Sequence, residues 1–285
     1  MCYSPLYAWK MQKEDVDTGE MITYMKISKY EHDVINREAD FTLPCGKCAE
    51  CLYQKSLEWS YRIMLESKDY LNSCFITLTY KDDPVQLIKS DYQKFLKRLR
   101  KKIGKFRYFL CGEYGSKGKR PHFHAIIFGY WPKDAEKVVN PITREETDYW
   151  KSKELEDIWG LGFVSVGELT QYDAKYCAKY MQKLQAMPDN FVQPFVAMST
   201  HPGLGLKQFE EHKEAYLKSD KIYFQGNYIK LPRYFLNNTL KDLPEFFDDY
   251  LNLREYRQIR ADLVPNTDAN FAERKKKYKK LLKSC

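Results

Sequence analysis

The stretch "KRPHFHAIIFGY", residues 119–130, places His122 and His124 two positions apart in an apolar run. Its β-branched and aromatic residues, bounded by Pro121 and Gly129, are typical of a β-strand. Side chains alternate across a strand, so both histidines are expected on one face and Phe123 on the other. The chain has 5 histidines, and two of them are thereby predicted to share one small area of surface.

A second strand is predicted at 106–115, "FRYFLCGEYG", joined to the histidine strand by the turn "SKGKR". Glu113 lies near its end, where an antiparallel partner brings it beside the histidines. Two imidazoles and a carboxylate with open positions suit a catalytic divalent ion. Mixed nitrogen and oxygen ligands fit Mg²⁺ or Mn²⁺ acting on a phosphate, while Zn²⁺ and Fe²⁺ remain alternatives. The competing interpretation is a chance His-x-His, with one ring hydrogen-bonded and the other exposed.

Ile126 and Phe128 share the predicted histidine face, so a helix is expected to cover them beside the metal. Further strands are predicted at 74–80 and 161–169, and helices at 90–104 and 170–184. Hairpin connections between these elements predict an α+β fold with a central antiparallel sheet backed by helices. The predicted division is an N-terminal extension at 1–70, a core at 71–185, and a C-terminal extension at 186–285. The N-terminal extension is predicted to be irregular up to 43, apart from pieces such as "MITYMKIS", and then to form a cysteine knuckle that runs into a helix within 44–70. The core carries a polar insertion at 132–153, and the C-terminal extension a predicted hairpin within 220–235.

Both predicted helices have N-terminal capping signals. Ser90 with Gln93 and Thr170 with Asp173 each have capping-box spacing. The first helix has an apolar stripe at helical spacing, consisting of Phe95, Leu96, Leu99 and Ile103.

The second helix, "TQYDAKYCAKYMQKL", contains tyrosines at successive i+4 steps, namely Tyr172, Tyr176 and Tyr180. Lys175 and Lys179 form a parallel stripe. Taken alone, the tyrosines would be read as amphipathic packing. Next to a metal that polarises a phosphate, a tyrosine hydroxyl becomes a competent nucleophile, and a lysine can stabilise the developing charge.

The composition points to a polyanionic partner. The formal net charge is +8, and 274–283, "RKKKYKKLLK", is strongly basic. No secretory signal or apolar run of membrane-spanning length is visible, so a cytosolic protein without membrane association is expected. In a reducing compartment the 8 cysteines are better explained as thiols or metal ligands than as disulfides.

Three cysteines have metal-ligand spacing. Cys45, Cys48 and Cys51 form C-x-x-C-x-x-C, which suits tetrahedral Zn²⁺, and Cys2 is the best candidate for a fourth ligand. Reduced thiols at a helix N-terminus are the alternative. Cys74, Cys111 and Cys177 lie in apolar runs and are predicted to be core residues.

Together these motifs resemble the HUH-type endonucleases that initiate rolling-circle replication, and more narrowly the initiators of gokushovirus-type microviruses. The similar features are the strand "FITLTY", the histidine–hydrophobic–histidine motif "HFH" with an upstream Glu113, and the helix "YCAKY". "MCYSP" and "PCGKCAECLYQKSLEWSYR" also resemble the phage group. "MSTHPGLG" resembles a signature that usually has an arginine where this chain has Thr200 or His201.

The resemblance implies a ferredoxin- or RRM-like sheet with the metal strands at its centre and the tyrosine helix across them. It implies Glu113, His122 and His124 as metal ligands, Tyr176 and Tyr180 as alternating nucleophiles, and Lys179 as their assisting cation. One tyrosine would cut single-stranded origin DNA, leaving a 5′-phosphotyrosine and a 3′-hydroxyl that primes synthesis. The other would cut the regenerated origin, and the circle would be closed. A host helicase and polymerase in the bacterial cytoplasm are the implied partners.

Two other functions compete with this one. A non-catalytic single-stranded DNA- or RNA-binding protein on an RRM-like sheet would use exposed aromatic residues, but has no use for Glu113, His122 and His124 together. A transposase or relaxase of the same superfamily would share the metal motif. The paired tyrosines and the cysteine run favour the phage initiator.

Overall fold

The computed structural model describes residues 6–16, 18–29, 41–115, 118–180, 187–188, 190–219, 221–224, 226–242 and 276. The chain forms two compact units, one containing the residues up to Lys55 and the other beginning at Ser56. The division at residues 70 and 185 stays a prediction.

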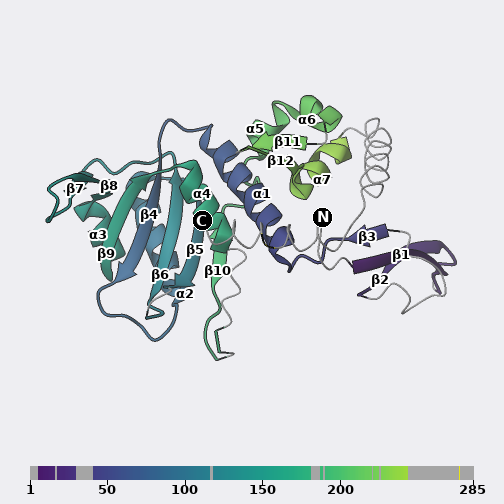
Figure 1. Ribbon diagram of the computed structural model, residues 1–285, viewed down its shortest axis with the longest axis horizontal. Helices are drawn as coiled ribbons and strands as arrows, with labels where there is room; N and C mark the ends of the chain where they lie inside the picture. Colours follow the sequence, from purple (N-terminus) through teal and green to yellow (C-terminus); the bar gives the residue numbers. More distant parts are fainter. Residues whose placement is uncertain are drawn as a thin grey trace. The chain divides into compact units, whose positions relative to one another are not determined.

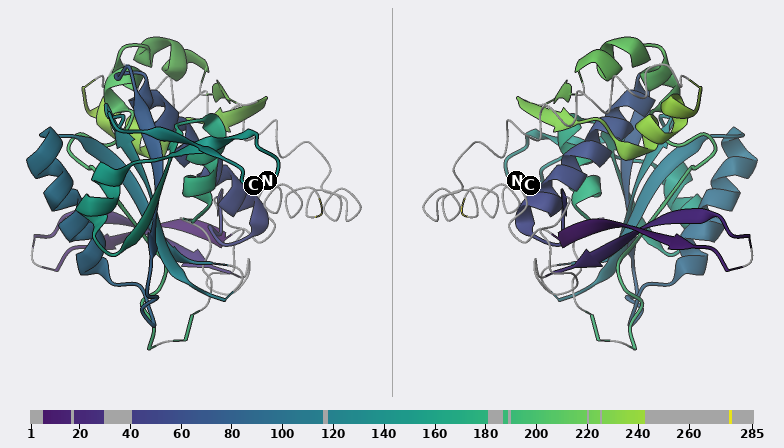
Figure 2. Two further views of the ribbon diagram at one scale, coloured as in Figure 1. Left: turned by 90° about the vertical axis from the view of Figure 1, so that its left-hand side faces the viewer. Right: turned by 90° about the vertical axis from the view of Figure 1, so that its right-hand side faces the viewer.

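In the first unit, β1 (Leu6–Glu14) pairs with β2 (Met21–Ser28) and with β3 (Phe41–Leu43) in an antiparallel sheet. β1 and β2 form the long twisted hairpin drawn in purple in Figure 2. β2 matches the strand-like piece "MITYMKIS". The prediction of irregular structure was wrong at β1, because pairing with β2 along Tyr7–Glu14 supplies backbone hydrogen bonds that local propensity does not reveal.

The second unit is built on a seven-stranded sheet in the order β10-β5-β6-β4-β9-β8-β7, with every pairing antiparallel (Figure 1). The strands are β4 (Ser73–Tyr80), β5 (Arg107–Tyr114), β6 (Pro121–Phe128), β7 (Glu136–Val139), β8 (Glu146–Lys151), β9 (Gly162–Glu168) and β10 (Phe195–Met198). The predicted α+β fold with a central antiparallel sheet is confirmed. Two central strands, β5 and β6, carry the candidate metal ligands.

One face of this sheet packs against α2 (Lys89–Ile103) and α3 (Lys153–Trp159). Phe123 points to this side, as alternation predicts, and its ring lies 5.9 Å from that of Trp159. Phe95, Leu96 and Leu99 of the predicted stripe are buried there. This layer fixes β6 in place, so the histidines must face the other way.

The opposite face is covered by parts of α1 (Ala49–Ser67) and α4 (Gln171–Tyr180). Ile63 of α1 and Cys177 of α4 pack with Ile126 and Phe128 of β6 in one buried cluster. The expectation that a helix covers these two β6 residues is confirmed. The three cysteines predicted for the core, Cys74, Cys111 and Cys177, are buried.

The two capping predictions had different outcomes. Thr170 and Asp173 form the predicted box, since the Asp173 N–H donates to Thr170 Oγ1 (3.2 Å) and the Thr170 N–H to Asp173 Oδ2 (2.9 Å). The Ser90 cap was wrong, because α2 begins at Lys89 with Ile88 at the N-cap and no side-chain cap. Ser90 is therefore already inside the helix.

The extensions contain more structure than predicted. The insertion at 132–153 forms the β7–β8 hairpin, which adds two strands to the sheet beyond β9. The hairpin predicted within 220–235 consists of β11 (Lys221–Phe224) and β12 (Asn227–Lys230). It ends earlier than predicted because α7 (Arg233–Asp242) starts directly after Pro232, a residue that favours the start of a helix. Short helices α5 (Leu206–Glu210) and α6 (Lys213–Ser219) precede it. Among the described residues, no helix is both long enough and apolar enough to cross a membrane.

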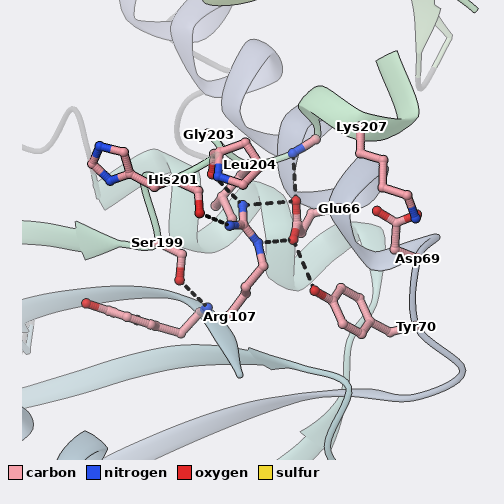
Figure 3. Close-up of polar contacts among 12 residues, drawn as sticks. Glu66, Asp69, Tyr70, Arg107, Ser199, His201, Gly203, Leu204 and Lys207 are labelled. Atoms are coloured by element: carbon pink, nitrogen blue, oxygen red, sulfur yellow. Dashed lines mark hydrogen bonds and ion pairs between the residues drawn. The ribbon is translucent and has the colours of Figure 1, made fainter. Parts of the chain in front are cut away.

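The "STHPGLG" loop is held to the sheet by a buried ion pair (Figure 3). Glu66 of α1 pairs with the guanidinium of Arg107 in β5 and also accepts the Gly205 N–H at 2.8 Å. Arg107 donates to the carbonyls of His201 (3.2 Å) and Pro202 (2.7 Å). Arg62 of α1 also donates to the Leu204 carbonyl at 3.2 Å. Guanidinium groups from β5 and from α1 therefore both hold this loop.

A candidate metal centre beside a tyrosine helix

Glu113, His122 and His124 converge at one end of the β5–β6 pair, where Glu113 and His124 are buried and His122 is half-buried. Glu113 lies opposite His122 in the antiparallel register. Glu113 Oε1 is 2.8 Å from His122 Nε2 and 3.1 Å from His124 Nε2. One ligand atom from each residue lies within 4.8 Å of the others. The sequence prediction that these three side chains meet therefore agrees with the structure.

The outer ring nitrogens are held by other groups. His122 Nδ1 is 3.0 Å from the Arg120 carbonyl oxygen, and His124 Nδ1 is 2.9 Å from Thr77 Oγ1. The His122 ring therefore faces an oxygen acceptor at both nitrogens, whereas a neutral imidazole has one N–H. An imidazolium with two N–H groups satisfies both acceptors, and so does a ring whose Nδ1–H donates to the carbonyl while Nε2 binds a cation. Outer hydrogen bonds of this kind orient metal-binding histidines. The residues fit a divalent ion.

The electrostatics of the cluster favour the forms that bind metal. Burial alone would raise the pKa of Glu113, but hydrogen bonds to His122 and His124 outweigh it and lower that pKa. Burial lowers the pKa of His124, although the contact with Glu113 opposes the shift. At neutral pH, Glu113 is then a carboxylate and His124 a neutral imidazole. These are the protonation states in which both residues bind metal.

Tyr176 of α4 lies against the metal cluster. Its ring centroid is 5.2 Å from that of His124, with the rings nearly perpendicular. Phe75 of β4 also packs on His124, with the two rings stacked and their centroids 5.4 Å apart. Lys179 and Tyr180 belong to α4, but their side chains lie outside the described part of the structure. One tyrosine of the i+4 stripe, Tyr176, therefore lies against a metal-ligand candidate. The roles of Tyr176, Lys179 and Tyr180 stay predictions.

Thr77 is a site residue that sequence reasoning missed. It lies in the "FITLTY" strand, directly opposite His124 in the register, and its hydroxyl contacts the outer nitrogen of that ring. A signal was present, because Thr77 and Thr79 are the polar residues on one face of an otherwise apolar strand. The strand pairing that brings Thr77 beside His124 could not be read from that pattern alone.

The three clustered cysteines lie just before and at the start of α1. Cys45 Sγ is 4.0 Å from Cys51 Sγ, and all three sulfurs lie within 4.8 Å of one another. The backbone N–H groups of Lys47 (3.4 Å) and Cys48 (3.3 Å) point at Cys45 Sγ, an arrangement that stabilises a thiolate. Gly46 permits the turn with its φ of 71°. Cys2 lies outside the described residues. The three thiols fit a Zn²⁺ ion.

We expect the purified chain to carry about one zinc per molecule. Cys48→Ser should lose it, because thiolates are the softer ligands that Zn²⁺ prefers. Elemental analysis by mass spectrometry gives the content. Cys74→Ala is the matched control, since burial raises the pKa of that thiol to about 12 and its zinc content should stay unchanged. If the purified wild-type protein contains no zinc, the proposed zinc site is ruled out.

Comparisons with known proteins match the part of the chain that contains these residues. Residues 73–185, which include the candidate ligands and α4, match the model of the replication-associated protein ORF2 family. The chain is 30% identical over 238 residues to replication-associated protein VP4 of Bdellovibrio phage phiMH2K, covering 78% of this chain and 75% of that protein. It is 29% identical over 283 residues to replication-associated protein ORF2 of Spiroplasma virus 4, covering 92% and 88%. Chlamydia phage 1 has a further relative, replication-associated protein ORF4, at 30% over 241 residues, covering 78% and 60%. No solved structure matches the chain.

The fold and site define an α+β protein with a strand-borne candidate metal centre facing a tyrosine helix. The chain belongs to the family of replication-associated proteins of gokushovirus-type phages.

Proposed function

We propose that the chain initiates phage DNA replication by nicking single-stranded origin DNA through attack by a tyrosine. One observation carries this proposal: two histidine Nε2 atoms and a carboxylate oxygen converge beside the ring of Tyr176. The names of the relatives, all replication-associated proteins, support the same role.

The proposed reaction is a transesterification at one phosphate. A divalent ion, Mg²⁺ or Mn²⁺, held by Glu113, His122 and His124 would polarise the scissile phosphate. The Tyr176 hydroxyl oxygen forms a bond to phosphorus, and the bond from phosphorus to the 3′ oxygen breaks. The phenolic proton ends on that 3′ oxygen. The products are a 5′-phosphotyrosine and a free 3′-hydroxyl, and the number of phosphate ester bonds is conserved.

The second half of the cycle would use Tyr180, one helical turn further along α4. It would cut the regenerated origin, and the released 3′-hydroxyl would attack the first phosphotyrosine and close the circle. Lys179 would stabilise the phenolate or the phosphate charge. A host helicase and polymerase would extend the 3′ end in the bacterial cytoplasm.

We expect Tyr176→Phe to retain part of the first cut, because Tyr180 can substitute, but to lose circular product by roughly tenfold or more, as expected when a nucleophile is removed. The double variant Tyr176→Phe/Tyr180→Phe should lose the covalent adduct by roughly 10³-fold or more, since neither proposed nucleophile remains. Adducts are counted on denaturing gels with labelled circular single-stranded DNA and Mn²⁺.

Tyr172→Phe is the matched control, because Tyr172 is 61% exposed and stacks on Tyr176 one turn earlier. It should form adduct and circles like the wild type. If the double variant still forms adduct at the wild-type level, Tyr176 and Tyr180 are not the nucleophiles. If the wild type binds single strands but forms no adduct with any metal tried, the non-catalytic binding protein replaces the initiator.

A further inference from the structure

The sheet face that carries the metal cluster continues past β4 to β9 and β8, where the large side chains that the structure describes are exposed. The helices α1 and α4 cover that face around Phe109 and Ile126. In the other direction, toward β9 and β8, its large side chains are exposed: Phe163 is 59% exposed and Tyr149 is 52% exposed. Figure 1 shows β9 and β8 on the side of β4 that faces away from β6. An open aromatic surface therefore adjoins the proposed cutting site.

Strand register connects this surface to the histidines in two rows. Directly paired residues point to the same face of a sheet. His122 pairs with Thr79, which pairs with Phe163. His124 pairs with Thr77, Thr77 with Ser165, and Ser165 with Lys151 at the end of β8. With strands about 4.8 Å apart, Phe163 lies on the order of 10 Å and Lys151 on the order of 14 Å from the histidine strand.

The insertion hairpin supplies the outer part of this surface. Trp150 pairs with the buried Val166 and faces the opposite layer, with its ring 5.1 Å from that of Trp131. Alternation along β8 then directs Tyr149 and Lys151 to the metal face. Lys151 is exposed and forms no salt bridge with any residue that the structure describes. The surface thus ends in an aromatic ring and an exposed cation.

We infer that the β7–β8 insertion extends the DNA-binding face, so that Phe163, Tyr149 and Lys151 hold the single strand on one side of the scissile phosphate. This inference rests on the proposed function and adds which residues of the sheet bind the single-stranded DNA next to the scissile phosphate. Exposed aromatic rings stack on bases without sequence preference, and a lysine contacts the phosphate backbone. The hydroxyl side chains of Thr77, Thr79 and Ser165 lie in the two rows that lead from the histidines to this surface. A protein partner is disfavoured by the continuity of this face with a phosphate-cutting site and by the net charge of +8.

The register also sets where this surface stops. Glu136 of β7 lies directly opposite Lys151 and is exposed. A carboxylate at that position repels a phosphate backbone, so the strand is held as far as β8 and not over β7.

The test measures single-strand binding in chelator, where no cleavage occurs, by fluorescence anisotropy with full-length protein. Phe163→Leu keeps an apolar side chain but removes the ring face, and the Kd should rise roughly 5- to 100-fold. Phe163→Tyr should restore binding. Lys151→Ala should reduce the slope of log K against log salt by about 0.7. Lys137→Ala is the matched control, because Lys137 lies over the Trp150 ring on the other face of the same hairpin.

Two results with the face variants separate this inference from the proposed function, and photocrosslinking tests the inference directly. Face variants that bind and cut like the wild type overturn the inference and leave the nickase intact. Face variants that lose binding, in a protein whose wild type forms no adduct with any metal, support the inference and overturn the nickase. Photocrosslinks from iododeoxyuridine-substituted DNA to Phe163 or Tyr149 support the inference, and crosslinks confined to other parts of the chain overturn it.

Discussion

Replacing His124 by alanine is expected to reduce DNA cleavage by at least about 100-fold while single-strand binding stays within about twofold, because loss of even an outer partner of a metal ligand typically costs 10- to 100-fold. Loss of the ligand itself should cost more. His124 Nε2 approaches the same Glu113 oxygen as His122 Nε2, so its removal takes away one of three ligands. Cleavage rates and Mn²⁺ binding by calorimetry give the two readouts.

Two further variants test whether the loss of cleavage is caused by the loss of metal binding. Thr77→Val removes the hydroxyl at His124 Nδ1 and should cost roughly 10- to 100-fold in metal affinity or activity, the range expected for an outer partner. His212→Ala, an exposed histidine elsewhere in the unit, should change neither quantity. Wild-type Mn²⁺ affinity in the His124→Ala protein would rule out the proposed metal centre.

The same cluster predicts a direction for the pH dependence of metal binding. Metal and protons compete for the histidine nitrogens. Because burial lowers the pKa of His124 below its ordinary 6.5, that ring stays neutral at pH 6.5 and competition at it begins only in more acid solution. Mn²⁺ affinity limited by His124 should therefore hold from neutral pH down to about 6.5 and fall at lower pH.

The second large effect concerns stability. Glu66→Ala is expected to lower the free energy of unfolding by about 3–5 kcal/mol, since it leaves the Arg107 guanidinium without its carboxylate. The side chain of Glu66 is 6% exposed, so solvent replaces the lost partner poorly. It also accepts hydrogen bonds from the Gly205 N–H and from the Tyr70 hydroxyl. For a unit of about 200 residues the melting temperature should fall by roughly 6 to 20 °C.

Lys207 and Asp69 provide the control for this change, because they form an ion pair at 2.9 Å beside the same loop, with the lysine exposed. Lys207→Ala should cost much less than Glu66→Ala, because solvent screens the exposed lysine. Equal small losses from Glu66→Ala and Lys207→Ala, measured by urea unfolding, would show that the buried pair does not hold the "STHPGLG" loop in place.

The core of the fold was predictable because its strands are short, are rich in β-branched and aromatic residues, and are joined by turns. Alternation placed Phe123 and the histidines on opposite faces, and the structure follows that pattern. The meeting of Glu113 with His122 follows from a local hairpin, which fixes register through its turn. The Thr170 cap was equally local. Each of these predictions needed only neighbouring residues.

Features that depend on distant pairing could not be read from the sequence. Thr77 meets His124 across 47 positions. Arg107 donates to the carbonyl oxygens of His201 and Pro202, which lie 94 and 95 positions away. The "MSTHPGLG" motif does not indicate that this arginine lies beside it. The insertion looked polar because β7 and β8 lie at the sheet edge, where one strand face is exposed and apolar alternation is weak. The Ser90 cap was wrong because α2 begins one residue earlier, at Lys89, without a side-chain cap, so the capping-box spacing did not mark the helix start.

The most direct test of the central claim is to locate the covalent bond. Full-length wild-type protein is incubated with circular single-stranded DNA of the source replicon and Mn²⁺, digested, and analysed by mass spectrometry for a nucleotide-bearing peptide. We predict the adduct on Tyr176 or Tyr180, absent when a chelator is present or when His122 is replaced by alanine. An adduct on a residue outside α4, or one that forms equally well in chelator, would contradict the account.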